Sequence, residues 1–533
     1  MKKFLQRKLL PILLVPAVFL PFAACGSGSA ASSSSQASSA ASAAASSAAP
    51  AASSAVSSGA PKQGGEFVFG VQTQPDHLDP FLAATADTRE ILFNIFEGLV
   101  KPDPDGNLQP ALAESYTVSK DALTYTFKLR SGVKFHNGSA VTPADVKYSL
   151  DAQAGLSGGK LLNANLSNIK SVTVSGSDTV AVHLKKADFD FLPYLTAAVV
   201  PKGYTDQDTH PIGTGPFEFD SYTPQQSLVL TRNPDYWQPD LPHLNKITFK
   251  LESDSNALLL ALQGGSVDGA SIANNVASQL DTGFGIIPSN SNAVQLLALN
   301  NKVKPFDSDL VRQAVSYAVN PDEIISSVCF GKGVRSGTPV IPGLKKYFDD
   351  SLTKAYNTDT AKAKQLLTEA GYPNGFSFTI TVPSNYTVHV DTAQVIVSEL
   401  KKVGITAAIK QVDFATWLST VYTNRDYEGT IVSVDGSALT PRCYLDRYVS
   451  TAANNFVNYS NPEYDALFAK AAAEPDEETR IDLYKQAQEL LSKDAASVYI
   501  QDISILNAIK DGVKGFTPYP LDGFDASTLY YTK

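Results

Sequence analysis

A break in composition limits the fold of this chain more than any other feature of its sequence. Residues 27–60 are almost entirely Ser and Ala, with no charged and no aromatic side chain. Such a stretch buries too little apolar surface to offset the entropy lost on ordering. We therefore expect a flexible tether over residues 26–60 and a folded part that begins near Pro61.

The segment before the tether has the features of an export signal. Four basic side chains lie within its first eight residues, and residues 9–20 form an apolar run. This run is too short for a comfortable membrane span, which favours a secretory signal peptide over residues 1–25. Cys25 at the cleavage point resembles the lipobox cysteine of bacterial lipoproteins, although Phe22 stands where Leu is usual. We predict lipidation of Cys25, with an ordinary signal peptide as the alternative.

The folded part is long and acidic. About 470 residues follow the tether, which is too many for one hydrophobic core, so we expect two or three lobes. Without the four basic residues of the leader, 39 Lys and Arg oppose 53 Asp and Glu, a net charge of −14. Binding to nucleic acid requires basic patches, so we expect no nucleic-acid partner.

Predicted strands and helices alternate along the folded part. Apolar and polar side chains alternate in residues 66–71 and 123–130, which is typical of half-buried strands. Thr142 followed by Pro143 is typical of a helix start, and residues 391–403 have amphipathic spacing with a glycine stop. No block consists only of helices or only of strands, so the fold class is α/β or α+β. Further helices are predicted at residues 88–97, 309–319, 321–328, 360–370 and 479–491, and further strands at residues 172–174, 180–182, 376–382 and 405–409.

Few patterns indicate catalytic or metal-binding chemistry. The six histidines are scattered, and none has the spacing of metal ligands. Residues 155–159 match G-x-S-x-G, but a nucleophile elbow follows a strand, whereas a predicted helix precedes this stretch. Two Ser-x-x-Lys tetrads, at 167–170 and 351–354, lack the companion motifs of penicillin-binding enzymes. We expect no enzymatic activity, no cofactor and no bound metal, and a secreted hydrolase is the enzyme alternative.

Two cysteines lie in the folded part. Cys329 and Cys443 could form one disulfide in an oxidising compartment, or they could both be buried thiols. The sequence leaves both possibilities open.

A series of short blocks occurs in a fixed order along the folded part. It includes Asn-Ile-Phe-Glu-Gly-Leu-Val at 94–100, Gly-Thr-Gly-Pro-Phe at 213–217 and Arg-Asn-Pro-Asp-Tyr-Trp at 232–237. The series resembles the extracellular solute-binding family that contains bacterial oligopeptide-, dipeptide- and nickel-binding proteins. We interpret the blocks as turn formers and core residues that identify the fold without binding ligand. The other blocks lie at residues 110–116, 123–130, 132–138, 145–150, 262–268, 305–307, 311–318, 369–376 and 459–465.

The resemblance implies an α/β, two-lobed periplasmic-binding-protein type II (cluster C) fold with an extra subdomain in lobe I. Lobe I would contain residues 61–290 and the C-terminal return 505–533, with the subdomain at about 101–200. Lobe II would contain residues 291–504. A ligand that touches both lobes binds the closed form better and shifts the population toward it.

The function implied is that of a substrate-binding lipoprotein of an ABC importer. It would capture a small peptide in the interlobe cleft and deliver it to the permease, as a monomer outside the cytoplasm that the lipid on Cys25 anchors to the cell membrane. Receptors of the same fold for a nickel chelate, an opine or a sugar are the alternatives. A receptor that signals without import is a third possibility.

The resemblance also implies a contact for the amino end of a peptide. Asp435, followed by Gly436, matches the Asp that pairs with the ligand α-ammonium, because a buried ammonium requires a nearby carboxylate. The alternative is that this pair of residues forms a tight turn. Val432 and Thr440 depart from the pattern of peptide-binding members.

Four further residues are candidate ligand contacts in lobe II. An aromatic position of the family matches Phe414 or, less well, Trp417. Arg442 could form a bidentate pair with a ligand carboxylate, or it could be a structural arginine. His389 is predicted in a loop that borders the cleft.

Overall fold

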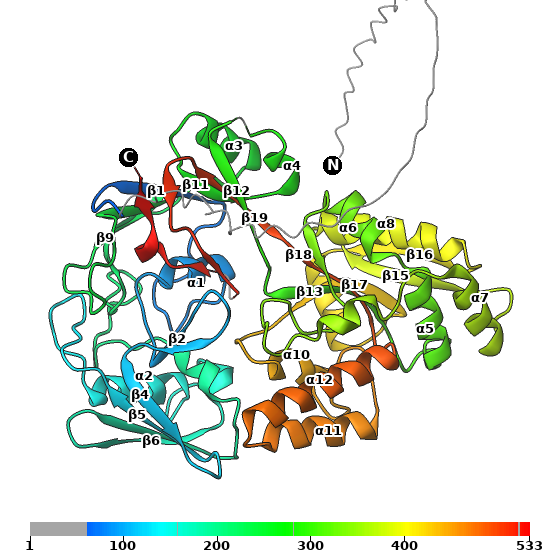
Figure 1. The fold of residues 1–533 in the computed structure, drawn as a ribbon, viewed down its shortest axis with the longest axis horizontal. Coiled ribbons are helices and arrows are strands. Elements are labelled where there is room, and N and C mark those ends of the chain that lie inside the picture. The colour runs from blue at the N-terminus through cyan, green and yellow to red at the C-terminus, as the bar shows by residue number, and fades with distance from the viewer. Residues whose placement is uncertain (1–60, 157, 281, 521–522, 533) are drawn as a thin grey trace, which may run out of the picture. The chain divides into compact units, whose positions relative to one another are not determined.

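The computed structural model describes residues 61–156, 158–280, 282–520 and 523–532. The predicted signal peptide, Cys25 and the tether lie outside these residues. Among the described helices, none is long and apolar enough to cross a membrane. Strands and helices alternate along the described residues, as in an α/β protein (Figure 1). Most of the strands and helices predicted from the sequence are present.

The first large sheet has seven strands in the order β12-β19-β11-β1-β10-β9-β8. Its central strand β1 pairs in parallel with β10 and β11, and its apolar side chains Phe67 and Phe69 are buried. Helix α3 begins after Asp254, whose side chain accepts hydrogen bonds from two backbone N–H groups of the first turn. The strands are β1 (Glu66–Val71), β8 (Phe217–Thr223), β9 (Ser227–Arg232), β10 (Lys246–Leu251), β11 (Gly269–Ile272), β12 (Phe284–Ser289) and β19 (Ile505–Lys510), and the helices are α1 (Ala86–Leu92), α3 (Ser255–Gln263) and α4 (Asn274–Ala277).

A four-stranded antiparallel sheet, in the order β4-β5-β7-β6, is separate from the two large sheets. Helix α2 begins at Pro143 as predicted, and the Asp145 carboxylate accepts a hydrogen bond from the Thr142 backbone N–H at 2.9 Å. This sheet, α2 and the loops around them share one apolar core, and we name residues 101–200 the subdomain. Its elements are β2 (Val100–Pro102), β3 (Leu108–Pro110), β4 (Ala113–Val118), β5 (Thr124–Leu129), α2 (Pro143–Gln153), η1 (Ala164–Leu166), β6 (Ile169–Ser175), β7 (Thr179–Leu184) and η2 (Leu192–Thr196).

The second large sheet has six strands in the order β14-β18-β13-β17-β15-β16. Strand β15 is parallel to both β16 and β17, so the carboxyl ends of these three strands lie at the same edge. The strands are β13 (Ala293–Leu299), β14 (Gly333–Arg335), β15 (Ser377–Pro383), β16 (Thr406–Val412), β17 (Gly429–Asp435) and β18 (Val498–Ile503). The helices are α5 (Asp309–Ala318), α6 (Pro321–Val328), η3 (Asp350–Lys354), α7 (Thr360–Glu369), α8 (Thr387–Lys401), α9 (Phe414–Trp417), η4 (Leu418–Thr423), α10 (Arg442–Leu445), η5 (Asp446–Tyr448), α11 (Pro462–Ala473) and α12 (Glu477–Lys493).

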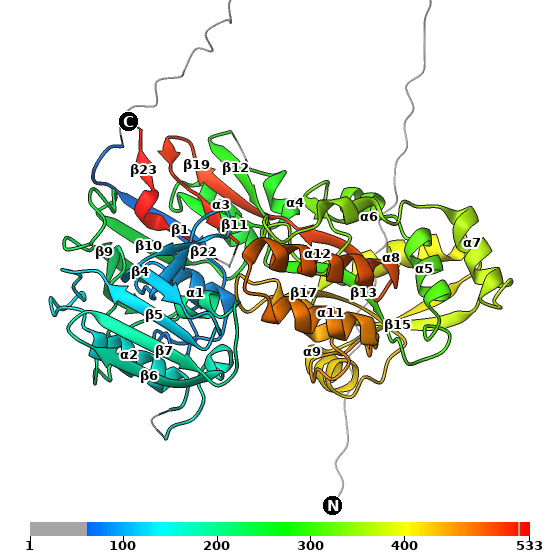
Figure 2. The same ribbon diagram turned by 60° about the horizontal axis from the view of Figure 1, so that its bottom comes forward.

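Two neighbouring chain segments connect the large sheets (Figure 2). Strand β12 leads into β13, and β18 leads back into β19. The pair β12–β19 is antiparallel in the first sheet, and the pair β13–β18 is antiparallel in the second. The chain therefore changes sheet at residues 290–292 and again at Ser504. We propose the lobe division on this basis, with lobe I at 61–290 and 505–533 and lobe II at 291–504.

The C-terminal residues return to lobe I. The Asn94 side chain accepts a hydrogen bond from the Ala526 backbone N–H at 2.8 Å. The short elements of this return are β20 (Val513–Lys514), β21 (Pro518–Tyr519), β22 (Gly523–Phe524), η6 (Ala526–Thr528) and β23 (Tyr530–Tyr531).

Candidate ligand-binding site

A cavity of about 620 Å³ lies between the lobes, which is within the range of small-molecule sites. Its lobe I wall comes from α1 and the chain that follows, from the subdomain near η1 and η2, and from Asp525. Its lobe II wall consists of Asn292, Asp435, Gly436, Ser437 and Ala438. The cavity therefore lies where a ligand can contact both lobes at once.

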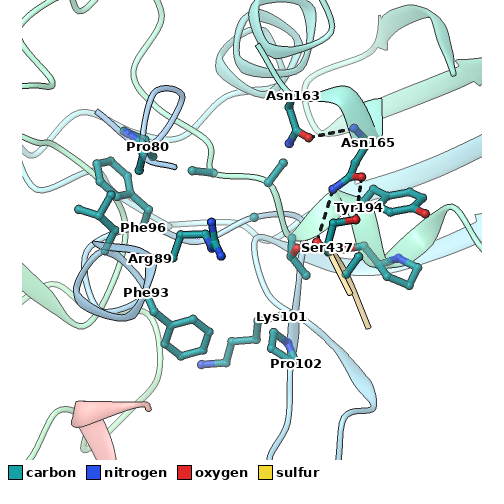
Figure 3. Close-up of a pocket in the computed structure, with 18 of the residues that line it drawn as sticks. Pro80, Arg89, Phe93, Phe96, Lys101, Pro102, Asn163, Asn165, Tyr194 and Ser437 are labelled. Atoms are coloured by element: carbon teal, nitrogen blue, oxygen red, sulfur yellow. Dashed lines mark hydrogen bonds between the residues drawn. The ribbon is translucent and has the colours of Figure 1, made fainter. Parts of the chain in front are cut away.

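The lobe I wall is mainly apolar and aromatic. Phe93 and Phe96 both line the cavity and lie beside Arg89 and Lys101 (Figure 3). Phe96 and three further lining residues belong to the block at 94–100, which we interpreted as purely structural. This block therefore also forms a wall of the cavity, a role that the sequence did not indicate.

The close packing of this wall depends on the Gly-Thr-Gly-Pro-Phe block. A Cβ atom on Gly213 would lie 2.0 Å from the carbonyl oxygen of Ile95, and one on Gly215 would lie 2.6 Å from that of Asn94. Only glycine allows the two segments to approach this closely. The separate sequence blocks therefore meet in space behind the cavity.

Glu97 is a buried carboxylate of this wall, with 6% of its surface exposed. It accepts hydrogen bonds from the Tyr236 hydroxyl at 2.9 Å and from Trp237 Nε1 at 2.8 Å. Burial raises the pKa of Glu97, while Lys101 and these two donors act in the opposite direction. Because its oxygens are satisfied from within lobe I, Glu97 holds the wall together.

Two cations of lobe I also reach the cavity (Figure 3). Lys101 Nζ lies 3.5 Å from Asp525 Oδ2, so its charge is partly balanced. Arg89 Nη1 donates a hydrogen bond to the Ala84 carbonyl oxygen at 2.7 Å.

Asp435 ends β17 and extends into the cavity from lobe II. Its backbone carbonyl accepts a hydrogen bond from Arg447 Nη2 at 3.0 Å. No described residue donates a hydrogen bond or forms an ion pair with its side-chain carboxylate, and the residue is exposed. Asp435 therefore presents a carboxylate without a described partner to a ligand.

Gly436 holds this segment close to the core of lobe II. Its carbonyl oxygen accepts a hydrogen bond from Asn292 Nδ2 at 2.7 Å, and the Tyr444 hydroxyl donates to Asn292 Oδ1. A Cβ atom on Gly436 would lie 2.4 Å from Cζ of Tyr444. Close approach to this ring therefore explains the glycine.

Ser437 bridges the two lobes at the rim of the cavity (Figure 3). Its hydroxyl donates to Asn165 Oδ1 at 3.0 Å, and Asn165 Nδ2 donates to the Ser437 carbonyl at 3.4 Å. The Asn163 side chain accepts from the Asn165 backbone N–H at 3.1 Å and so caps η1. We did not predict these asparagines, because no local pattern pairs residues of η1 with residues of lobe II.

The two predicted aromatic residues do not line the cavity. Trp417 is 4% exposed in the core of lobe II, where its Nε1 donates to Thr430 Oγ1 at 2.9 Å. Phe414 is exposed and stacks on Trp417, with ring centroids 5.8 Å apart. Both rings lie on α9, which follows the carboxyl end of β16.

Arg442 and His389 also lie outside the cavity wall. Arg442 Nη1 forms an ion pair with Asp188 Oδ2 of the subdomain at 2.7 Å, a contact of the kind expected for a structural arginine. His389 lies in α8 and not in a loop, because that helix begins at Thr387, before the predicted start at 391. Its Nδ1 lies 2.9 Å from Gln295 Nε2, and burial lowers its pKa to about 4.

The described residues also limit other chemistry. None of them forms a group of three or more His, Cys, Asp and Glu side chains that could hold a metal ion. Cys329 and Cys443 are free and buried thiols, which settles the alternative left open by the sequence.

Comparisons with known proteins agree with this architecture. The profile of the bacterial extracellular solute-binding proteins, family 5, matches residues 107–456. The glutathione-binding protein GsiB of Escherichia coli O1:K1 is 31% identical over 481 residues, which cover 86% of this chain and 93% of GsiB.

Two solved structures extend the likeness to three dimensions. The ABC transporter substrate-binding protein CtaP of Listeria monocytogenes has a TM-score of 0.79 at 28% identity, covering 89% of this chain and 100% of CtaP. The periplasmic binding protein DppA of Helicobacter pylori, in complex with the peptide STSA, has a TM-score of 0.71 at 27% identity, covering 89% of this chain and 99% of DppA. The predicted two-lobed type II fold is confirmed. The chain belongs to family 5 of the bacterial extracellular solute-binding proteins.

Proposed function

We propose that this protein captures a small peptide in the interlobe cavity and delivers it to the permease of an ABC importer. The observation that carries the proposal is the Asp435 carboxylate, which enters the cavity without a partner among the described residues. A carboxylate that a bound ligand shields from water requires a cation, and the α-ammonium of a peptide supplies one.

The opposite wall suits the rest of a peptide. Phe93 and Phe96 provide apolar surface for a side chain, and Arg89 and Lys101 provide positive charge for a carboxylate. Glutathione and the tetrapeptide STSA, named for two relatives, both carry a free α-ammonium and a carboxylate. This chemistry supports a peptide over a neutral sugar.

Capture follows from linkage between binding and closure. A ligand that contacts Asp435 of lobe II and the aromatic wall of lobe I binds the closed form better than the open form. Closure then encloses the ligand, and the permease recognises the closed lobes. The proposed role is capture and release, with no catalytic step.

The test compares a free-amine peptide with its acetylated form. Asp435→Asn should weaken binding of STSA about 100-fold, because removal of one partner of an enclosed charge pair costs several kcal/mol. It should change binding of N-acetyl-STSA about threefold or less, since that peptide has no ammonium to lose. Titration calorimetry measures both affinities, and the exposed Asp511→Asn is the matched control.

Equal losses for the two peptides would remove Asp435 from this role. Native mass spectrometry of the purified protein, with identification of any co-purified ligand, separates the peptide from the other ligand classes. A bound chelate, opine or sugar would contradict the proposed ligand and leave family membership intact.

We also propose that lipid on Cys25 anchors the protein to the cell membrane. The basic, apolar and small-residue order of residues 1–25 supports this proposal. Cys25→Ser should move the protein from the membrane fraction to the soluble fraction, as measured by immunoblot after ultracentrifugation. Unchanged partitioning would contradict the anchor.

A further inference from the structure

A second contact joins the lobes outside the cavity, and we name it the Asp188–Asp190 contact. Asp188 and Asp190 follow β7 in the subdomain and are 3% and 4% exposed. Arg442 Nη1 lies 2.7 Å from Asp188 Oδ2, and Arg480 Nε lies 3.3 Å from Asp190 Oδ1. The Tyr484 hydroxyl donates a hydrogen bond to Asp190 Oδ2.

The subdomain holds its side of this contact in place. Asp188 Oδ1 accepts a hydrogen bond from the Asp190 backbone N–H at 3.0 Å, and the Asp188 carbonyl accepts one from the Tyr125 hydroxyl. The Asp188 carboxylate is therefore oriented by its own loop. Phe189 between them lies 5.8 Å from the Arg480 guanidinium carbon, over the face of the ring.

Lobe II presents its cations from two helices. Arg442 begins α10, while Arg480 and Tyr484 lie one turn apart on α12. Arg480 Nη1 donates to the Glu474 carbonyl at 2.9 Å, which fixes the side chain before it meets Asp190. Asp188 and Arg480 are thus each held by their own lobe in position for the contact.

The contact is connected to the cavity through η2 and α10. Tyr194 of η2 lines the cavity, and its hydroxyl lies 3.6 Å from Sγ of Cys443, the residue after Arg442. Asp435 and Ser437 precede α10 in the chain. The chain segments that include η2 and α10 therefore form part of the cavity wall and part of the Asp188–Asp190 contact.

We propose that Asp188, Asp190, Arg442, Arg480 and Tyr484 are positioning residues for ligand capture, which set the closed–open equilibrium without touching the ligand. Buried charges are tolerated only when they are paired, so the closed form requires that all of these partners meet. Opening separates the pairs and returns the side chains to water. The apparent affinity of a ligand depends on the closed population, which links this contact to the proposed function.

A single substitution should shift the closed–open equilibrium toward the open form, because it leaves one buried charge without its partner. Arg442→Gln leaves the Asp188 carboxylate in the closed interface without its cation, and that cost falls on the closed form. Asp188→Asn leaves Arg442 without its anion in the same place. A charge swap, Asp188→Arg with Arg442→Asp, restores one opposite-charge pair and should recover closure.

Closure is measured without ligand, so the result does not depend on the proposed peptide. Spin labels on Ser175→Cys of the subdomain and Lys401→Cys of lobe II report the interlobe distance, because both sites are exposed. The full chain carries Cys25→Ser, and its other cysteines are buried. Pulsed electron resonance should show longer distances for Arg442→Gln and Asp188→Asn than for the parent, with recovery in the charge swap.

The control removes a cation whose ion pair lies within one lobe. Arg335 Nη1 pairs with Asp322 Oδ2 at 2.8 Å inside lobe II, so Arg335→Gln should leave the interlobe distance unchanged. Distances that are equal for Arg442→Gln, Asp188→Asn, Arg335→Gln and the parent would overturn the proposal. Thermal unfolding of each variant separates a change in closure from a loss of folding.

A binding measurement separates positioning from ligand contact. Arg442→Gln should weaken STSA and N-acetyl-STSA by the same factor, about 5- to 30-fold, because it acts on closure alone. Asp435→Asn should instead discriminate between the two peptides. A preference of Arg442→Gln for one peptide would return this arginine to the ligand site and overturn its positioning role.

Discussion

Lobe II contains two groups of polar side chains near the crossover strands, and they use their hydrogen bonds in different ways. The cavity edge consists of Asn292, Asp435, Gly436 and Ser437, and it carries one exposed carboxylate without a described partner. The buried polar cluster consists of Gln295, His389, Gln501 and Asp502, which are all 4% exposed or less.

Three members of the buried polar cluster contact one another, and the fourth, Asp502, contacts Ser291. Gln501 Nε2 donates to Gln295 Oε1 at 2.8 Å, and Gln295 Nε2 lies 2.9 Å from His389 Nδ1. Asp502 Oδ1 accepts from the Ser291 backbone N–H at 2.7 Å. Polar residues alone therefore do not mark a binding site, since the cavity edge is distinguished by its exposure and by its unpaired charge.

The largest expected effect is on the free energy of unfolding, and it concerns Asp502 of the buried polar cluster. Its Oδ2 is buried without a hydrogen-bond partner among the described residues, and burial raises its pKa from 3.8 to about 8. The native state then binds a proton that the unfolded state releases, so stability is full below about pH 3.8 and is lost as pH rises through about 8. The free energy of unfolding should fall by about 1 kcal/mol per pH unit between pH 5 and 8.

The substitution Asp502→Asn should remove the Asp502 contribution to this slope, because an amide does not titrate, while Asp190 and Glu399, whose pKa values burial raises to about 6 and about 7, still contribute. Urea unfolding at several pH values measures it, and Asp511→Asn, an exposed position, should retain the slope of the parent. A parent protein whose stability does not change over this range would contradict a protonated Asp502. Ligand affinity should not follow the same dependence, because Asp502 does not line the cavity.

The next largest effect concerns Gly436 of the cavity edge. A methyl group there must displace the Tyr444 ring, which would disturb the bond to Asn292 and the direction of Asp435. Gly436→Ala should lower stability by about 1–3 kcal/mol and weaken STSA binding about tenfold. Gly159→Ala is the matched control, since nothing lies within 4 Å of its added Cβ, and a full affinity in Gly436→Ala would show that the edge tolerates movement.

Local patterns predicted the elements well and the long-range pairs poorly. The strand at 66–71 and the helix start at Pro143 follow from alternation and capping, which are properties of neighbouring residues. The start of helix α8 at Thr387 was not predicted, because its N-cap Tyr386 makes no side-chain capping bond and the sequence there carries no start signal.

The residues of the candidate site also differ in whether the sequence could predict them. Asp435 was predicted because residues 431–436 match the stretch that carries the ligand-pairing Asp of peptide-binding members, and it lines the cavity. The partner of Arg442 could not be found, because Asp188 belongs to another lobe and no nearby residue indicates the pairing. The lining role of the block at 94–100 was missed for a related reason, since only the fold shows that one face of this block borders a cavity.

The smallest expected effect on binding concerns His389, and it separates the two groups most directly. Burial lowers the pKa of His389 to about 4, so it is neutral in the folded protein and its contribution to stability is present above about pH 6.5. That contribution is lost as pH falls from about 6.5 to about 4, where the unfolded state alone binds the proton.

His389→Gln should lower the free energy of unfolding by about 1 kcal/mol at pH 7.5, through its bond to Gln295, and should change STSA affinity less than twofold. His210→Gln, at an exposed position, should change neither quantity, and a tenfold loss of affinity in His389→Gln alone would place this histidine back among the ligand contacts.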